Sequence, residues 1–335
     1  MGPRAVIFGC AGPELTEAER RFFAAAAPWG FILFGRNVGT PAQLRRLTAT
    51  LRDCVGRDAP ILIDQEGGRV ARLRGPDWRE WAPALDDCRR IVDPAARARA
   101  MYLRYRLIAG ELRAVGIDVD CAPVLDLASE ATHAIIRNRC YGDAPGDVAL
   151  VGRAVAEGLL DGGVLPVMKH MPGHGRATVD SHLALPSVDA PRESLAADFA
   201  PFRALVDLPM AMTAHVVFTA LDPDAPATLS PVMVRLIRDE VGFDGLLMTD
   251  DLSMKALTGS FGARADRALA AGCDMVLHCN ADPEEMEAVA AAVPKLAGRA
   301  AERADAALAR RRPSRDGSVE EMAAEFAALS GCAHA

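Results

Sequence analysis

Short apolar runs rich in β-forming residues recur eight times along the 335-residue chain, and each is followed by a turn signal. Stretches with helical periodicity lie between them. This alternation is the strongest constraint on the fold, because strands that alternate with helices form a parallel sheet covered by helices. The runs are apolar on both faces, as buried parallel strands are. They occupy residues 5–12, 30–37, 60–68, 117–127, 164–173, 208–218, 245–254 and 274–279.

The helical stretches carry start and stop signals. Thr16 and Glu19 have the spacing of a capping box. Four other stretches begin with an N-cap residue followed by proline at the first helical position, at 40–41, 93–94, 230–231 and 282–283. Glycines are expected just past the ends of four helices, at Gly116, Gly163, Gly242 and Gly272.

Eight strand–helix units across nearly the whole chain predict an α/β fold, a single (β/α)8 TIM barrel. A doubly wound open sheet is the alternative. We expect the catalytic barrel to span residues 1–310, and residues 311–335 to form a C-terminal tail with a short helix. Too little chain follows the eighth run for an additional C-terminal α/β sandwich domain.

The charge balance argues against two classes of partner. The chain has 38 basic and 45 acidic residues and a net charge of −7, unlike a nucleic-acid-binding protein or one with a polybasic membrane patch. No apolar run has transmembrane length, and the N-terminus does not resemble a signal peptide. The eight cysteines are scattered and form no C-x-x-C pair. We therefore expect a cytoplasmic protein without a disulfide framework.

Polar side chains collect at the ends of the predicted strands. In a barrel these ends meet at one face, where active sites lie. Acids and bases from five separate strands therefore predict a catalytic mouth. They are Asp64, Asp126, Lys169, His170, His215 and Asp250.

Asp250 follows a buried apolar run, which would deliver its carboxylate to the mouth. A retaining glycosidase needs such a carboxylate as its nucleophile, together with a separate proton donor. The residue pattern alone leaves a second interpretation open, in which Asp250 caps the next helix.

The stretch KHMPGHGRATVDSH, residues 169–182, contains three of the seven histidines. Its proline and glycines predict a loop. Asp180 and His182 are two apart, so in an extended loop they project to the same side. The carboxylate could then fix the tautomer of the imidazole and raise its basicity, which makes His182 a candidate general acid/base.

Three other interpretations of this stretch remain open from the residues alone. His170, His174 and His182 could bind zinc, with His215 as a further ligand, although the spacing is not that of a helical zinc motif. Residues 173–176 could form an anion nest. The loop could also simply be rich in histidine.

Several segments, taken together and in order, resemble one enzyme family. They are IDQEGGRVARLR (63–74), APVLDL (122–127), RNRCYGD (137–143), KHMPGHG (169–175), DSH (180–182), PATLSP (226–231) and TDDLSMKAL (249–257). The set resembles the NagZ-type β-N-acetylhexosaminidases of glycoside hydrolase family 3 over about residues 5–290. Four residues depart from the usual motif residues, so the resemblance does not extend to loop packing or aglycone preference: Met171, Cys140, Tyr141 and Arg176.

The resemblance implies a retaining enzyme that removes terminal β-linked N-acetylglucosamine. It implies cytoplasmic peptidoglycan recycling, with N-acetylglucosaminyl-anhydro-muropeptides as substrates. Asp250 would be the nucleophile, His182 the acid/base and Asp180 its dyad partner. The sugar-binding positions would be Asp64, Arg72, Arg139, Lys169 and His170.

The resemblance implies neither a metal nor a cofactor, and we expect a monomer. Three other functions remain as alternatives. One is a β-N-acetylglucosaminide phosphorylase that uses the same residues, since a histidine acid/base does not repel phosphate. The others are a zinc hydrolase built on the loop histidines and a sugar-binding barrel without catalysis.

Overall fold

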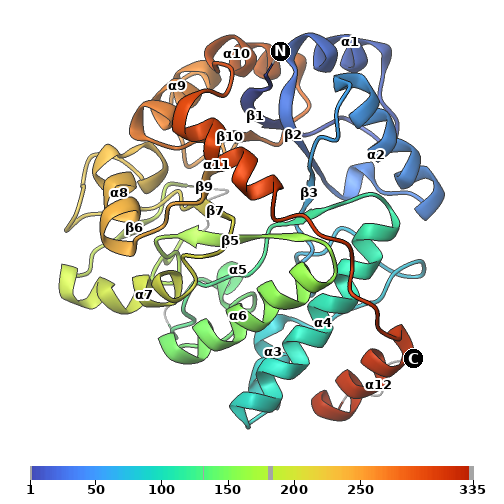
Figure 1. The fold of residues 1–335 in the computed structure, drawn as a ribbon. Helices are drawn as coiled ribbons and strands as arrows, with labels where there is room; N and C mark the ends of the chain where they lie inside the picture. Colours follow the sequence, from blue (N-terminus) through green and yellow to red (C-terminus); the bar gives the residue numbers. More distant parts are fainter. Residues whose placement is uncertain (1, 131, 180–183, 332–335) are drawn as a thin grey trace.

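In the computed structural model, which describes residues 2–130, 132–179 and 184–331, eight parallel strands close into a barrel (Figure 1). The strand order around the barrel is β1-β10-β9-β7-β5-β4-β3-β2. The predicted single (β/α)8 barrel is confirmed, and closure of the sheet rules out the open doubly wound alternative. The strands are β1 (Arg4–Phe8), β2 (Pro28–Leu33), β3 (Ile61–Ile63), β4 (Val119–Asp120), β5 (Leu165–Met171), β7 (Met210–Thr213), β9 (Leu246–Asp251) and β10 (Met275–His278).

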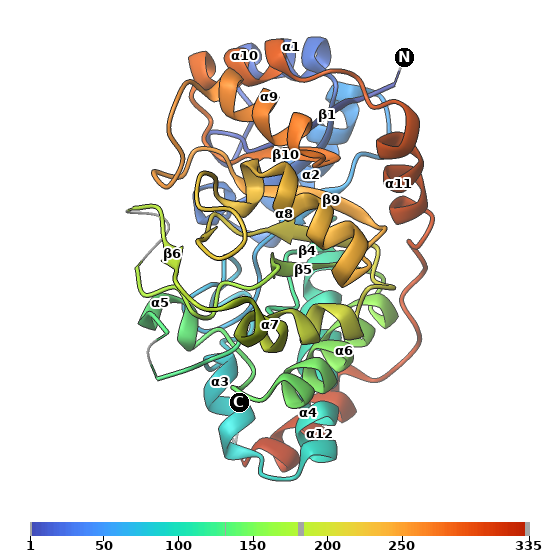
Figure 2. The same ribbon diagram turned by 90° about the vertical axis from the view of Figure 1, so that its left-hand side faces the viewer.

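Helices surround the barrel and alternate with its strands, as the sequence pattern predicts (Figures 1 and 2). A small parallel pair, β6 (Ser187–Val188) with β8 (Val217–Phe218), lies outside the barrel. The α-helices are α1 (Glu17–Ala26), α2 (Pro41–Val55), α3 (Ala84–Arg90), α4 (Pro94–Ala114), α5 (Ala134–Arg137), α6 (Pro145–Asp161), α7 (Arg192–Ala204), α8 (Pro231–Leu236), α9 (Phe261–Ala271), α10 (Pro283–Ala292), α11 (Gly298–Leu308) and α12 (Val319–Ser330). Short turns of other helix types are η1 (Gly35–Asn37), η2 (Ala227–Leu229) and η3 (Ile237–Val241).

The local sequence signals correspond to the observed element ends. Thr16 and Glu19 form the predicted capping box at the start of α1. The four predicted N-cap residues, Thr40, Asp93, Ser230 and Asp282, each accept a hydrogen bond from a backbone N–H in the first turn. The glycines at the four predicted helix ends have φ between 79° and 111°, a conformation that costs other residues free energy.

The fourth strand differs from its prediction. The apolar run covers residues 117–127, but β4 spans only Val119–Asp120, and the parallel pairing resumes at a single bridge between Val124 and Lys169. Pro123 lies in the gap and has no N–H to donate to a ladder. Asp126 therefore stands on irregular backbone beside β5.

The C-terminal segment runs along the outside of the barrel to α12, which packs on α4 (Figure 2). Arg312 and Arg315 both pair with Asp161 at the end of α6, at 2.8 and 3.0 Å. Arg99 of α4 donates two hydrogen bonds of 2.7 Å to Glu325 of α12. These contacts lie away from the mouth and fasten the end of the chain to the barrel. None of the helices in the described part of the chain is long and apolar enough to cross a membrane.

Candidate active site

A cavity opens at the carboxyl ends of the barrel strands, where the sequence predicts the catalytic mouth. Its volume is about 220 Å³. One part of its wall is charged and comes largely from the ends of β3, β5 and β9. Another part is apolar and includes Phe34, Met212, Met254 and Leu277. The polar lining residues are Asp64, Arg69, Arg72, Arg139, Lys169, His170, His174, Asp250 and Asp251.

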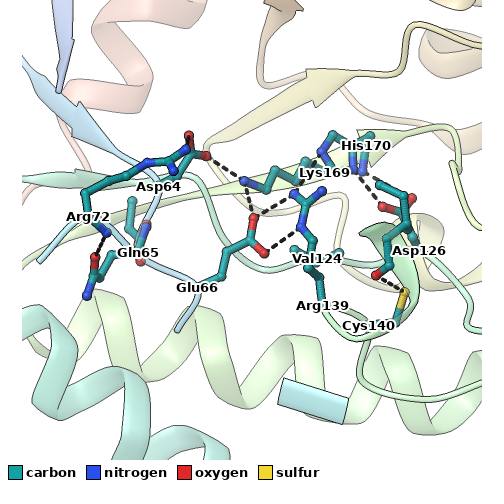
Figure 3. Close-up of polar contacts among 12 residues, drawn as sticks. Asp64, Gln65, Glu66, Arg72, Val124, Asp126, Arg139, Cys140, Lys169 and His170 are labelled. Atoms are coloured by element: carbon teal, nitrogen blue, oxygen red, sulfur yellow. Dashed lines mark hydrogen bonds and ion pairs between the residues drawn. The ribbon is translucent and has the colours of Figure 1, made fainter. Parts of the chain in front are cut away.

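Glu66 joins two of the predicted sugar-binding residues (Figure 3). It accepts two hydrogen bonds from Arg139, of 2.7 and 2.8 Å, and its Oε1 lies 2.7 Å from Lys169 Nζ. Glu66 is 2% exposed, so the carboxylate is held by the protein on both oxygens. It fixes the positions of the Lys169 ammonium and the Arg139 guanidinium.

Asp64 lies at the end of β3 and is bound by two cations. Lys169 Nζ donates to its Oδ1 at 2.7 Å, and Arg72 Nη2 donates to its Oδ2 at 3.1 Å. The backbone N–H of Arg72 donates to the Gln65 side chain at 2.7 Å. The Arg72 guanidinium also lies over the Phe34 ring, 5.3 Å from its centroid. Arg72 is thereby positioned from two sides.

The charges of this network determine the ionisation of its carboxyls. Burial by itself would raise the pKa of Glu66, but Arg139 and Lys169 outweigh burial and lower the pKa from 4.5 to about 2. Lys169 and Arg72 likewise hold the pKa of Asp64 well below its ordinary value, against burial. Asp64 and Glu66 raise the pKa of Lys169, although burial opposes them. At neutral pH both carboxyls are ionised and the lysine is charged.

The lowered pKa of Glu66 predicts a pH range for acid unfolding. As the pH falls, the unfolded chain takes up a proton near 4.5, whereas the folded protein holds the carboxylate down to about 2. The contribution of the Glu66 carboxylate is therefore complete above pH 4.5 and is lost between 4.5 and 2. The loss is on the order of 3 kcal/mol for Glu66 alone. Urea unfolding at several pH values tests this, and a Glu66→Gln variant should show a shallower acid dependence. An equally steep dependence in the variant would contradict the assignment.

His170 is oriented by Asp126. Its Nδ1 lies 2.7 Å from Asp126 Oδ2, and its Nε2 lies 3.3 Å from Arg139 Nη2. Both side chains are buried, and Figure 3 shows the imidazole between the aspartate and the guanidinium. Asp126 lies behind the cavity wall, so His170 is the member of the pair that faces the cavity.

Asp250 lies in β9 and its side chain lines the cavity. The interpretation of Asp250 as a helix cap is wrong, because the next helix, α9, begins at Phe261 and is capped by Ser260. One carboxylate oxygen accepts from the backbone N–H of Asp251 at 2.8 Å. Burial favours protonation, but the nearby His215, His170 and Lys169 outweigh it and lower the pKa. An ionised, largely unshared carboxylate at this place can act as a nucleophile.

Asp251 and His215 form hydrogen bonds with the backbone around Asp250. Asp251 accepts from the N–H groups of Ser253 and Cys279, at 2.9 and 3.0 Å. His215 bridges Thr228 and the Asp251 carbonyl oxygen, at 2.7 and 2.9 Å. Asp251 therefore ties the end of β9 to Cys279, which follows β10, and His215 ties the end of β9 to Thr228 in η2.

His174 differs from the other histidines of the mouth. It is 1% exposed, and neither ring nitrogen has a hydrogen-bond partner in the described part of the chain. Burial and the neighbouring His170 lower its pKa to about 4, so the ring is neutral at physiological pH. The turn that carries it is close-packed, because a Cβ at Gly175 would lie 2.1 Å from the Leu127 carbonyl oxygen. The turn is therefore packed against the backbone that follows β4.

Six of the eight predicted site residues line this one cavity. The other two, Asp180 and His182, lie outside the described residues. His182 is also one of the three ligands of the zinc hypothesis. Among the described residues, those of the cavity included, no three His, Cys, Asp or Glu side chains gather in a way that could hold a metal ion. The six residues that meet are Asp64, Arg72, Arg139, Lys169, His170 and Asp250.

Sequence reasoning missed the part played by Glu66 and Asp126. Glu66 stands in the segment DQEGGRV, two residues after Asp64, and the run of three polar residues directly after an apolar strand was the available signal. Asp126 was noted as a strand-end acid but without a partner. Its partner His170 is 44 residues away, and only the closed barrel brings them together.

Comparisons with known proteins agree with this geometry. The chain matches the family model described as Glycosyl hydrolase family 3 N terminal domain over residues 15–311. A beta-hexosaminidase from Alkalilimnicola ehrlichii is 40% identical over 301 residues, which cover 88% of this chain and 85% of that protein. NagZ from Neisseria gonorrhoeae in complex with N-trifluoroacetyl-D-glucosamine has a TM-score of 0.86 at 31% identity, with 99% of this chain and 98% of that chain covered. That NagZ has also been solved in complex with zinc ion.

Proposed function

The chain belongs to glycoside hydrolase family 3 and is a β-N-acetylhexosaminidase, and we propose that it removes terminal β-linked N-acetylglucosamine with retention of configuration. The observation that carries this proposal is the ionised Asp250 carboxylate in a cavity whose charged wall offers hydrogen-bond donors and acceptors. The sugar analogue bound by the gonococcal NagZ is an N-acylated glucosamine, which supports the choice of sugar.

Each side chain has a role in this proposal. Lys169, Arg139 and Arg72 donate hydrogen bonds to sugar hydroxyls, and Asp64 accepts from them. Glu66 holds two of these cations in place, so that the sugar meets a pre-organised wall. Binding energy from this wall would position the anomeric carbon against Asp250.

The proposed reaction has two steps. Asp250 forms an ester bond with the anomeric carbon while the bond to the aglycone oxygen breaks, and His182 gives that oxygen its proton. A water oxygen then attacks the anomeric carbon, His182 takes the proton of the water, and Asp250 leaves as a carboxylate. The role of His182, with Asp180 as its partner, rests on the sequence motif.

The natural substrate is proposed from the same motifs. N-acetylglucosaminyl-anhydro-muropeptides would make the enzyme part of cytoplasmic peptidoglycan recycling. The phosphorylase alternative has no support from the relatives, whose names are those of hexosaminidases.

The stereochemical course tests the proposal. We expect the enzyme to hydrolyse an aryl β-N-acetylglucosaminide to the β-anomer of N-acetylglucosamine, as followed by proton NMR during the first turnovers. Activity should be unchanged after dialysis against a chelator, because none of the proposed steps uses a metal. An α-anomer as the first product would contradict retention. Loss of activity with chelator, restored by zinc, would instead favour the zinc hydrolase.

A further inference from the structure

We propose that Asp126 is a positioning residue that keeps the proton of His170 on Nδ1, so that Nε2 accepts a hydrogen bond from a free hydroxyl of the bound sugar. The inference rests on the proposed function, because it places the sugar in the cavity beside His170. It adds a requirement on the substrate: the hydroxyl that faces His170 must carry its proton.

Asp126 directs both carboxylate oxygens toward protein donors. Its Oδ2 lies 2.7 Å from Nδ1 of His170. Its Oδ1 accepts from the backbone N–H of His170 at 3.3 Å and from that of His174 at 2.6 Å. The side chain is 1% exposed. Asp126 therefore acts on the sugar through His170 and through the backbone that carries it.

The charge of Asp126 determines which nitrogen of His170 is protonated. Burial raises the pKa of Asp126, but the hydrogen bonds that it accepts from the His170 ring and from the backbone N–H of His174 favour the ionised form, and its pKa lies below the ordinary value. The carboxylate can only accept hydrogen bonds, so Nδ1 must donate. On the other side, the Arg139 guanidinium can only donate, and it lies 3.3 Å from Nε2. Both neighbours require the same neutral tautomer.

This tautomer discriminates between sugar substituents. The lone pair of Nε2 faces Arg139 at 3.3 Å, and both Arg139 and Lys169 line the cavity. A sugar hydroxyl takes over this lone pair as a donor, and its oxygen accepts from the cation that it displaces. A fluoro, O-alkyl or O-acyl substituent has no proton to donate, so Nε2 stays with Arg139 and the substituent loses the hydrogen bond that a hydroxyl would make.

Asp126→Asn should remove the preference for a hydroxyl over a substituent that has no proton. The amide oxygen is expected to stay on the two backbone N–H groups, so the amide nitrogen would face Nδ1 of His170. That nitrogen donates, which moves the imidazole proton to Nε2. Nε2 would then repel Arg139 and could donate to a substituent without a proton.

Calorimetric binding of N-acetylglucosamine and its 3-, 4- and 6-deoxyfluoro analogues tests the proposal without relying on turnover. In the unaltered protein, the analogue with fluorine in place of the hydroxyl that faces His170 should bind at least about ten-fold more weakly than N-acetylglucosamine. In Asp126→Asn the penalty at that position should fall to about two-fold, with the penalties at the other two unchanged. Asp305→Asn, an exposed aspartate in α11, is the matched control and should behave like the unaltered protein.

The outcomes separate the proposals. A merely structural role for Asp126 predicts equal weakening for all four sugars, and equal penalties in both proteins would overturn the inference. If the unaltered protein does not bind N-acetylglucosamine, the proposed function fails as well. Nitrogen-15 NMR of the unaltered protein, with His170→Gln to assign the signal, gives a readout that does not depend on folding of the aspartate variant. A His170 ring protonated on Nε2 would overturn the proposal.

Discussion

Replacement of Asp250 by asparagine is expected to lower kcat on an aryl β-N-acetylglucosaminide by roughly 10,000-fold or more. The amide cannot form the ester bond to the anomeric carbon, and no other ionised carboxylate of the described cavity wall is as free. Asp64 is bound by two cations, and Asp251 accepts from the N–H groups of Ser253 and Cys279. Steady-state kinetics measure the effect.

The fold of the Asp250→Asn variant should be preserved. The side chain is nearly isosteric, and the amide oxygen can keep the 2.8 Å hydrogen bond from the Asp251 N–H. Asp305→Asn serves as the matched control with full activity. An Asp250→Asn protein that keeps more than about one per cent of the activity would contradict the assignment.

Azide gives a second, chemical readout of the same residue. In Asp250→Ala the face of the sugar that the nucleophile occupied is open to a small anion. Azide should form a bond to the anomeric carbon while the bond to an activated aryl leaving group breaks. The α-glycosyl azide is therefore the expected product of a β-glycoside. Formation of the β-azide, or no rescue combined with full folding, would contradict the placement of Asp250 below the anomeric carbon.

Glu66→Gln is expected to have the second largest effect, on stability and activity together. Glu66 is 2% exposed and binds the cations of Arg139 and Lys169. A neutral amide in its place cannot compensate their positive charges. Removal of one partner from a buried charge network costs about 3 kcal/mol of the free energy of unfolding. Because Lys169 and Arg139 lose their fixed positions, kcat/KM should also fall about 100-fold.

Urea unfolding and steady-state kinetics check the two effects of Glu66→Gln separately. Glu302→Gln is the matched control, because Glu302 pairs with Arg299 on the exposed surface and such pairs contribute little. A folded Glu66→Gln variant with unaltered stability and unaltered kcat/KM would show that the network around Glu66 does not organise the site.

The barrel could be predicted from the sequence because its signals are local. Each of the eight apolar runs overlaps one barrel strand, and the capping residues mark the helix starts. Closure of the sheet follows from the number of alternating units. The interruption after Asp120 could not be predicted from apolar character, because Pro123 has an apolar side chain and yet cannot donate to a strand ladder.

The candidate site could be predicted only in part. Strand-end positions and motifs brought Asp64, Lys169 and Asp250 to one cavity, since parallel strands end on the same face. The pairings within the site depend on distances between residues far apart in the chain. Glu66 meets Arg139 across 73 positions, and no local pattern encodes that contact.

The central claim is that Asp250 forms a covalent bond with the sugar. A 5-fluoro N-acetylglucosaminyl fluoride slows hydrolysis of the glycosyl-enzyme more than its formation, so the intermediate should accumulate. Peptide mass spectrometry of the trapped protein should then find the label on the peptide that contains Asp250, at that residue. A label on any other residue, or a stoichiometrically inactivated protein without a label on that peptide, would contradict the account.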